Sequence, residues 1–128
     1  MKNTCFDVED RMIVGIGNDI VEVKRFEHLR ERFIERCYTQ REINAASGRI
    51  SFFAANFSVK ESVSKSFGTG IRGFEIRDIE VLRDDLGKPY VVLHDSAEKL
   101  AQDLGITNIF VSISDTKDLI MTMAVAEG

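Results

Sequence analysis

The sequence predicts a single α+β domain with a mainly antiparallel sheet, one long helix and several shorter helices. Its 128 residues match the size of one domain, which buries roughly two-thirds of its surface on folding. Short β-branched segments occur in pairs separated by turn residues, a pattern typical of hairpins. Segments with apolar residues three or four positions apart lie between them and predict helices. The resulting order of strand, helices, hairpin, helix and hairpin indicates the α+β class.

The composition narrows the class of protein. With 44% hydrophobic residues, 30% charged residues and a net charge of −4, the chain fits a globular protein and not a globally basic nucleic-acid binder. No apolar run reaches the ~18 residues of a membrane helix, so we expect no membrane partner. Cys5 and Cys37 form no CxxC motif, which argues against a zinc site or a disulfide framework and suits the cytoplasm. The acidic start MKNTCFDVEDR does not resemble a signal peptide. We expect residues 1–11 to be a flexible extension and residues 12–128 to form the domain.

The first part of the chain predicts a strand followed by two helices. Residues 12–20 (MIVGIGNDI) are short, β-branched and interrupted by glycine, so we expect a strand that leads into a loop. Residues 21–37 place apolar side chains at helical spacing. Residues 39–47 follow as a short helix in which Thr39 and Glu42 are spaced as a capping box.

The last part of the chain predicts two hairpins and a helix. FEIRDIEVL and PYVVL read as strands joined by the turn DDLGK, while NIFVSISD and LIMTMAVA are joined by TKD. The four predicted strands cover residues 74–82, 89–93, 108–115 and 119–126. Between the hairpins, residues 96–105 predict a short helix that Gly105 ends.

The long helix predicted for residues 50–67 carries two kinds of side chain. Glu61 and Lys65 lie on one row of the helix, flanked by Lys60 and Ser64. They are either an ordinary ion pair on a solvated face, worth ~0.2–0.5 kcal/mol, or part of a site. Gly68 ends the helix and lets backbone N–H groups of the GTG turn approach a ligand. A separate apolar stripe is assigned to the core and consists of Phe52, Ala55, Val59, Val63 and Phe67.

Asp19 follows GIGN at the end of the first predicted strand. It either caps the next helix or combines with Glu61 in a site of hard oxygen ligands. The motif lacks the third glycine of GxGxxG, so it does not indicate a dinucleotide site. Two carboxylates leave most positions around Mg²⁺ to water and substrate phosphate. Lys60 and Lys65 would add positive charge for an anionic ligand.

Four segments together resemble the holo-(acyl-carrier-protein) synthase family, the small single-domain type of 4′-phosphopantetheinyl transferase. They are GIGNDIVEVKR, FSVKESVSKSFGTGI, LGKPYVVL and VSISDTKD, and the resemblance extends from Met12 to about Ala126. The pattern FxxKExxxK, combined with the upstream GxD and the following FGTGI, is a specific signal. The resemblance implies the fold of that family and a homotrimer with active sites between subunits.

The resemblance also implies a Mg²⁺-dependent reaction of fatty-acid biosynthesis. The phosphopantetheine group of coenzyme A is transferred to a serine hydroxyl of an apo acyl carrier protein, and adenosine 3′,5′-bisphosphate is released. Asp19 and Glu61 match the Mg²⁺ ligands of the family and, with Lys65, its catalytic residues; Glu61 or a metal-bound water would act as the base. The segment Gly87-Lys88-Pro89 would face the coenzyme of a neighbouring subunit. The implied contacts to coenzyme A are Arg49, Lys60, Ser64, Lys65, Gly68, Thr69, Gly87, Pro89 and Thr116.

Residues 22–41 carry six Lys or Arg and four Glu, a local excess of positive charge in an acidic chain. Acyl carrier proteins are strongly acidic, and the resemblance implies that they dock on this segment through Arg25, Arg32 and Arg36. The alternative is a solvated helix face with ion pairs along it.

The sequence departs from the family pattern at several positions. Asn56 stands where arginine usually precedes the motif phenylalanine, so a contact to a coenzyme A phosphate is either missing or supplied by Arg49. Asp115 stands where many members have histidine; we expect it at the rim of the active site, either as a hydrogen-bond acceptor or as a turn cap. Three serines replace motif alanines on what we expect to be a polar face: Ser58, Ser62 and Ser66. Two other functions stay open, a Mg²⁺-dependent phosphohydrolase of nucleotide diphosphates and a non-catalytic carrier-protein binding module.

Overall fold

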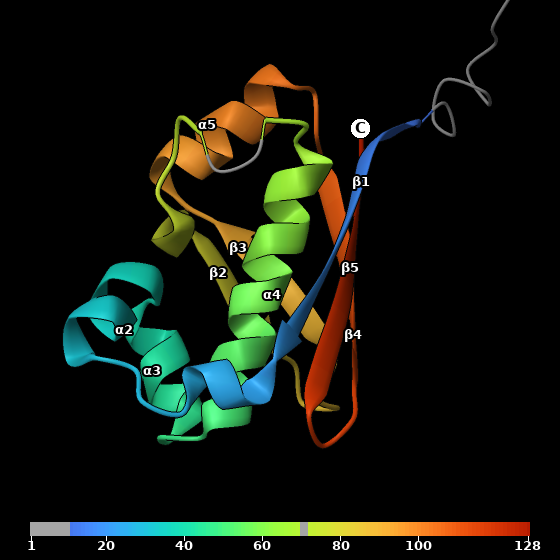
Figure 1. Cartoon of the computed structure of the whole chain (residues 1–128). Coiled ribbons are helices and arrows are strands. Elements are labelled where there is room, and N and C mark those ends of the chain that lie inside the picture. The colour runs from blue at the N-terminus through green and yellow to red at the C-terminus, as the bar shows by residue number, and fades with distance from the viewer. Residues whose placement is uncertain (1–10, 70–71) are drawn as a thin grey trace, which may run out of the picture.

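The computed structural model describes residues 11–69 and 72–128, so residues 1–10, most of the predicted extension, lie outside the described residues. The described chain is an α+β domain in which the long helix α4 packs against two antiparallel sheets (Figure 1). The predicted fold class is therefore confirmed. None of the helices in the described part of the chain is long and apolar enough to cross a membrane.

The larger sheet has three strands in the order β1-β5-β4. The hairpin of β4 (Asn108–Asp115) and β5 (Leu119–Glu127) confirms the second predicted hairpin. The first strand, β1 (Ile13–Glu22), pairs antiparallel with β5 along its length and extends two residues beyond the prediction. Alternate residues of β5 are buried, as expected for a strand with one face on the core.

The smaller sheet is the hairpin of β2 (Ile79–Arg83) and β3 (Pro89–Leu93). The bounds of β3 match the prediction, whereas the predicted strand 74–82 is wrong in its first half. There the chain forms the 3₁₀ turn η2 (Ile76–Asp78). Phe74 is buried against Phe67 at the end of α4, with ring centroids 5.7 Å apart, so the chain must bend before it enters the sheet.

Helix α4 (Ile50–Ser66) confirms the predicted long helix but not the polar face expected for its serines. Helix α4 is buried on nearly all sides, because the two sheets cover it from different directions. The serines that we expected on a polar face are buried, and Ser58 and Ser62 both hydrogen-bond the Thr122 hydroxyl, at 2.8 and 2.6 Å. Small hydroxyl side chains thus let α4 and β5 approach while satisfying each other's polar groups.

The single helix predicted for residues 21–37 is wrong. Strand β1 continues to Glu22, a 3₁₀ turn η1 (Val23–Phe26) follows, and helix α2 begins only at Glu31 and ends at Cys37. Val21 is paired with Ile120 of β5, and the Val23 N–H donates to the Asp118 carbonyl at 2.9 Å, so this β-branched stretch stays with the sheet. The apolar residues of this segment face the core for another reason, because Phe26 and Phe33 both pack on Phe57. Their ring centroids lie 5.5 and 5.9 Å from that of Phe57.

The predicted start of α3 (Gln40–Ala46) and the predicted end of α5 (Asp95–Asp103) are both confirmed. In α3 both hydrogen bonds of the Thr39–Glu42 capping box are present. Helix α5 is followed by Gly105 at φ +76°. The N–H groups of Gly105 and Ile106 donate to carbonyls of the last turn, which is a Schellman ending.

The outer face of the three-stranded sheet is apolar and exposed. Ile16 and Ile20 of β1, Met121 and Met123 of β5 and Phe110 of β4 are between 52% and 66% exposed. Ile20 lies opposite Met121 in the register of the two strands. A contiguous apolar surface of this kind on a small domain indicates contact with another protein surface.

Candidate active site

Asp19, Glu61 and Lys65 converge where β1 crosses α4. Asp19 lies on the inner side of β1, and its side chain is 16% exposed. Lys65 donates from Nζ to the Asn18 carbonyl at 2.8 Å and approaches Asp19 Oδ1 at 3.4 Å. Glu61 lies one turn before Lys65 on α4 and is half-buried. The structure therefore brings together the three residues that were predicted to be catalytic.

The glycines of the GIGND segment explain how strand and helix come so close. A Cβ atom on Gly17 would lie 1.9 Å from the Ser62 carbonyl oxygen, and one on Gly15 would lie 2.0 Å from the Ser66 carbonyl oxygen. Only glycine allows this contact. The motif serves to pack β1 against α4, and this packing sets Asp19 beside the charged row of α4.

The electrostatics of this site suit a cation. Burial, and then the nearby Asp19 carboxylate, raise the pKa of Glu61, while Lys65 lowers it. Asp19 Oδ2 is sheltered from solvent and has no hydrogen-bond partner among the described residues, so this oxygen is free to accept a ligand. The described residues contain no group of three His, Cys, Asp or Glu able to hold a metal. Two carboxylates fit Mg²⁺, which usually takes one or two protein carboxylates with substrate phosphate.

Lys60 and Ser64 do not join this site, in contrast to the prediction. Lys60 is fully buried; Nζ donates to Glu42 Oε1 at 2.8 Å and to the Ile79 carbonyl. Burial lowers the pKa of Lys60, and Glu42 opposes that shift. The Ser64 hydroxyl is buried and donates to the Lys60 carbonyl at 2.8 Å. Both side chains are committed to the interior and cannot reach a phosphate at the surface.

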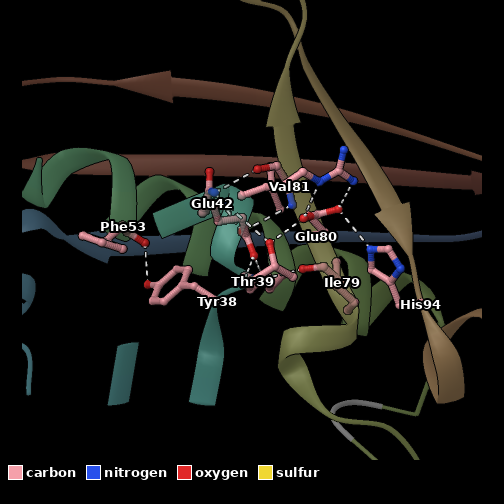
Figure 2. Close-up of polar contacts among 11 residues, drawn as sticks. Tyr38, Thr39, Glu42, Phe53, Ile79, Glu80, Val81 and His94 are labelled. Atoms are coloured by element: carbon pink, nitrogen blue, oxygen red, sulfur yellow. Dashed lines mark hydrogen bonds and ion pairs between the residues drawn. The ribbon is translucent and has the colours of Figure 1, made fainter. Parts of the chain in front are cut away.

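Glu42 is the structural residue whose wider role the sequence did not indicate. Besides its cap bonds to Thr39, it accepts hydrogen bonds from Lys60, from Asn56 at 2.8 Å and from the Val81 N–H at 3.3 Å (Figure 2). It thereby ties α3, α4 and β2 together. Asn56 is itself fully buried and also donates to the Val81 carbonyl at 3.0 Å, so its amide N–H groups are used inside the domain.

A second group of predicted residues lines a cavity of about 270 Å³ beside the start of α4. The cavity brings together Arg49, Gly87 and Pro89, all expected at coenzyme A, with Asp115 at the end of β4. Thr116 follows Asp115 and closes the β4–β5 turn, where its hydroxyl oxygen accepts the N–H groups of Asp118 and Leu119. Thr116 thus caps this turn with its side chain, and Asp115 lines the neighbouring cavity.

These two groups lie on different sides of α4. Phe52, which lines the cavity, precedes Glu61 by nine positions. At ~100° per residue the two side chains point in roughly opposite directions from the helix axis. Gly68, at φ +79°, and Thr69 follow α4 close to Lys65. The remainder of the GTG turn, Gly70, lies outside the described residues.

The residues expected to bind a protein partner are exposed. Arg25 belongs to η1, and Arg32 and Arg36 belong to α2. Arg25 also lines a cavity of about 250 Å³ whose other walls are apolar and include Phe57. Since Phe57 and Glu61 are one helical turn apart on α4, this basic and apolar surface adjoins the carboxylate site.

Comparison with known proteins gives one family. A family model described as the 4′-phosphopantetheinyl transferase superfamily matches residues 15–124. The chain is 45% identical over 118 residues to the holo-[acyl-carrier-protein] synthase of Lachnoclostridium phytofermentans, covering 91% of this chain and 97% of that protein.

Solved structures agree with this match. The crystal structure of the Neisseria meningitidis synthase superposes with a TM-score of 0.83 at 34% identity, over 91% of this chain and 100% of that one. The Bacillus anthracis synthase, solved in complex with CoA (3′,5′-ADP), superposes with a TM-score of 0.76 at 37% identity, over 91% and 98% of the two chains.

Proposed function

The chain belongs to the holo-(acyl-carrier-protein) synthases of the 4′-phosphopantetheinyl transferase superfamily, and we propose that it transfers 4′-phosphopantetheine from coenzyme A to a serine of an apo acyl carrier protein. The observation that carries the proposal is the convergence of Asp19, Glu61 and Lys65, in which the sheltered Oδ2 of Asp19 has no partner within the described part of the chain. A place in fatty-acid biosynthesis in the cytoplasm is part of the same proposal.

The reaction moves one phosphoryl centre between two oxygens. The serine hydroxyl oxygen of the carrier attacks the phosphorus that bears the pantetheine arm. The bond from that phosphorus to the bridging oxygen of the pyrophosphate breaks, and the bridging oxygen leaves on adenosine 3′,5′-bisphosphate. The serine proton needs a base, and the half-buried Glu61 carboxylate is the group of this chain that would accept it.

Asp19 and Glu61 are the residues that would hold Mg²⁺. The ion would neutralise charge that develops on the pyrophosphate oxygens. Lys65, whose ammonium group is half-exposed beside Asp19, would bind a phosphate oxygen as a compact positive charge. The backbone at Gly68 and Thr69 would approach the same phosphates from the end of α4.

We propose that the active site is shared between copies of the chain in a homotrimer. Glu61 and the cavity beside Phe52 point to opposite sides of α4, so one coenzyme molecule would bridge them more readily from two copies than from one. The exposed apolar face of the three-stranded sheet supplies a surface that such an assembly would bury. Thr116, Gly87 and Pro89 of one copy would then contact the coenzyme held at Asp19 and Glu61 of its neighbour.

The carrier protein would dock on residues 22–41. Exposed Arg25, Arg32 and Arg36 suit an acidic partner, because complementary charge speeds encounter and fixes orientation. The apolar cavity beside Arg25 would let the partner bury an apolar side chain near the carboxylate site.

Coenzyme A consumption tests this function against the two alternatives. With Mg²⁺ present, the protein should consume coenzyme A only when an apo carrier protein is added. Consumption without carrier would favour a phosphohydrolase. Tight carrier binding without consumption would favour a binding module.

A further inference from the structure

Two arginines are held beside the cavity at the start of α4. Arg83, the last residue of β2, and Arg49, which precedes α4, both line this cavity. Their guanidinium carbons lie 4.6 and 5.1 Å from the ring centroid of Phe52. Stacking on an aromatic ring fixes a guanidinium group without neutralising its charge. Asp115, exposed at the end of β4, is the one acidic residue that lines the same cavity.

In contrast to Arg49, Arg83 has no polar partner among the described residues. Arg49 donates from Nε and Nη2 to the carbonyls of Ala46 and Ala45 at 3.0 and 2.9 Å, which anchors it on the end of α3. No residue in the described ranges accepts a hydrogen bond from Arg83, and its Nη1 is also sheltered from solvent. Burial lowers the pKa of Arg83, Glu42 opposes this shift, and Arg49 adds to it. A sheltered guanidinium N–H group without an acceptor among the described residues indicates that an anionic group from outside them binds here.

We propose that Arg83, together with Arg49, binds the 3′-phosphate of coenzyme A and is the residue that distinguishes coenzyme A from dephospho-coenzyme A. The proposal rests on the proposed function. A phosphate monoester carries close to two negative charges, and two N–H groups of the planar guanidinium group of an arginine match two of its oxygens. No nitrogen of the Arg83 guanidinium group, the sheltered Nη1 included, has an acceptor among the described residues. Asn56 cannot take this role, because its amide is buried and donates to Glu42 and Val81.

The kinetic test compares two donors. Arg83→Met keeps an unbranched apolar side chain against Phe52 and removes the charge. Arg83→Lys keeps the charge but loses the planar guanidinium group with its paired N–H donors. Arg77→Met, an exposed arginine of η2 that does not line this cavity, is the matched control. With a saturating apo carrier, Arg83→Met should lower kcat/KM for coenzyme A by roughly 10- to 100-fold, the range for losing a charged hydrogen-bonded contact. It should change kcat/KM for dephospho-coenzyme A by less than about threefold, Arg83→Lys should be intermediate, and the control should match the wild type.

A binding measurement makes the inference independent of turnover. In calorimetry, the wild-type protein should bind adenosine 3′,5′-bisphosphate more tightly than adenosine 5′-monophosphate, and Arg83→Met should lose this preference. If a folded Arg83→Met variant keeps the full wild-type preference, Arg83 does not bind the 3′-phosphate and the inference is overturned. If the preference depends on Arg83 but no carrier protein is modified, the inference holds and the proposed function alone fails.

Discussion

The Asp19 carboxylate has an environment that folding alone does not explain. One oxygen is near Lys65, while the other is sheltered, has no partner in residues 11–69 and 72–128, and belongs to a carboxylate close to Glu61. If both carboxylates act through one Mg²⁺, Asp19→Ala and Glu61→Ala should each lower kcat by at least ~10²-fold. The double variant should be little worse than either single variant, because the two residues act as a unit. Steady-state kinetics with a saturating carrier measure this.

Two controls accompany this prediction: the melting temperature of Asp19→Ala, and the kcat of a variant at a distant carboxylate. Asp19→Ala should keep a melting temperature close to that of the wild type, because the ion pair that it removes, with half-exposed Lys65, contributes little to stability. Glu98→Ala, at an exposed position of α5, should leave kcat unchanged. Near-normal turnover in either Asp19→Ala or Glu61→Ala would mean that the two carboxylates do not share an ion.

The contacts of the Glu80 carboxylate predict how the free energy of unfolding changes at acid pH. Burial acts to raise its pKa, but hydrogen bonds from Arg41, Thr39 and His94 together lower it to about 2, below the ordinary value of 4.5 (Figure 2). The unfolded chain therefore binds a proton at higher pH than the folded chain. The stability that Glu80 contributes is fully present above pH ~4.5 and is lost as pH falls towards ~2.

Unfolding of Glu80→Gln and wild type as a function of pH checks this sign. Between pH ~4.5 and ~2 the free energy of unfolding of the wild type should fall more steeply than that of the variant. Glu75→Gln, an exposed neighbour in the sequence, should behave like the wild type. Parallel curves for Glu80→Gln and wild type would show that Glu80 is not held in its charged form by these contacts.

At the residue scale, local relations could be predicted from the sequence, whereas contacts between distant segments could not. Helical spacing correctly placed Glu61 beside Lys65, because that relation is local. The same spacing could not reveal that Lys60 is buried, since its partner Glu42 comes from α3 and the Ile79 carbonyl from β2. Nothing in the sequence indicated that Arg83 has no polar partner among the described residues. An arginine at the end of a strand usually points into solvent, and its sequence context does not show whether an acceptor lies nearby.

At the scale of elements, the close packing of β1 on α4 holds the site together. Gly17→Ala would place a methyl group against the Ser62 carbonyl, so strand and helix must separate. We expect a loss of stability of at least about 1–3 kcal/mol, the usual range for overpacking, and a large fall in kcat as Asp19 moves from Glu61. Denaturant unfolding and kinetics measure the two effects. Asn18→Ala, exposed on the same strand, is the control; wild-type behaviour of Gly17→Ala would contradict the packing.

Element boundaries were predictable where local chemistry sets them. The capping box at Thr39 and the glycine ending at Gly105 depend on neighbouring residues alone, and both are confirmed. The segments 21–37 and 74–82 were assigned wrongly, because their conformation depends on distant contacts. Phe26 and Phe33 share Phe57 as their target, and Phe74 packs on Phe67. A regular helix or strand cannot make these contacts, so the chain bends.

At the scale of the molecule, the exposed sheet face predicts assembly. Met121→Asp places a charge in the centre of this face, opposite Ile20, where burial would leave it unpaired. We expect the wild type to be a trimer in light scattering and the variant to be a folded monomer with at least ~10²-fold lower kcat, because a site shared between copies is then incomplete. Leu86→Asp, 94% exposed at the tip of the β2–β3 hairpin, should stay trimeric. A fully active wild-type monomer would contradict the shared site.

The apolar face was partly visible in the sequence. The segment LIMTMAVA of β5 is apolar at most positions of both faces, whereas a strand with one solvated face normally alternates. That signal predicts a surface covered on both sides. It does not give the number of copies, which depends on the angle between the surfaces that meet.

Mass spectrometry of an apo acyl carrier protein tests the central claim most directly. The carrier is incubated with this protein, coenzyme A and Mg²⁺, in parallel with a carrier whose modified serine is replaced by alanine and with a sample containing a chelator. The account predicts that only the intact carrier with Mg²⁺ gains the mass of one phosphopantetheine group, with one adenosine 3′,5′-bisphosphate released for each group transferred. An unmodified carrier under these conditions, or release of the bisphosphate without transfer, would contradict it.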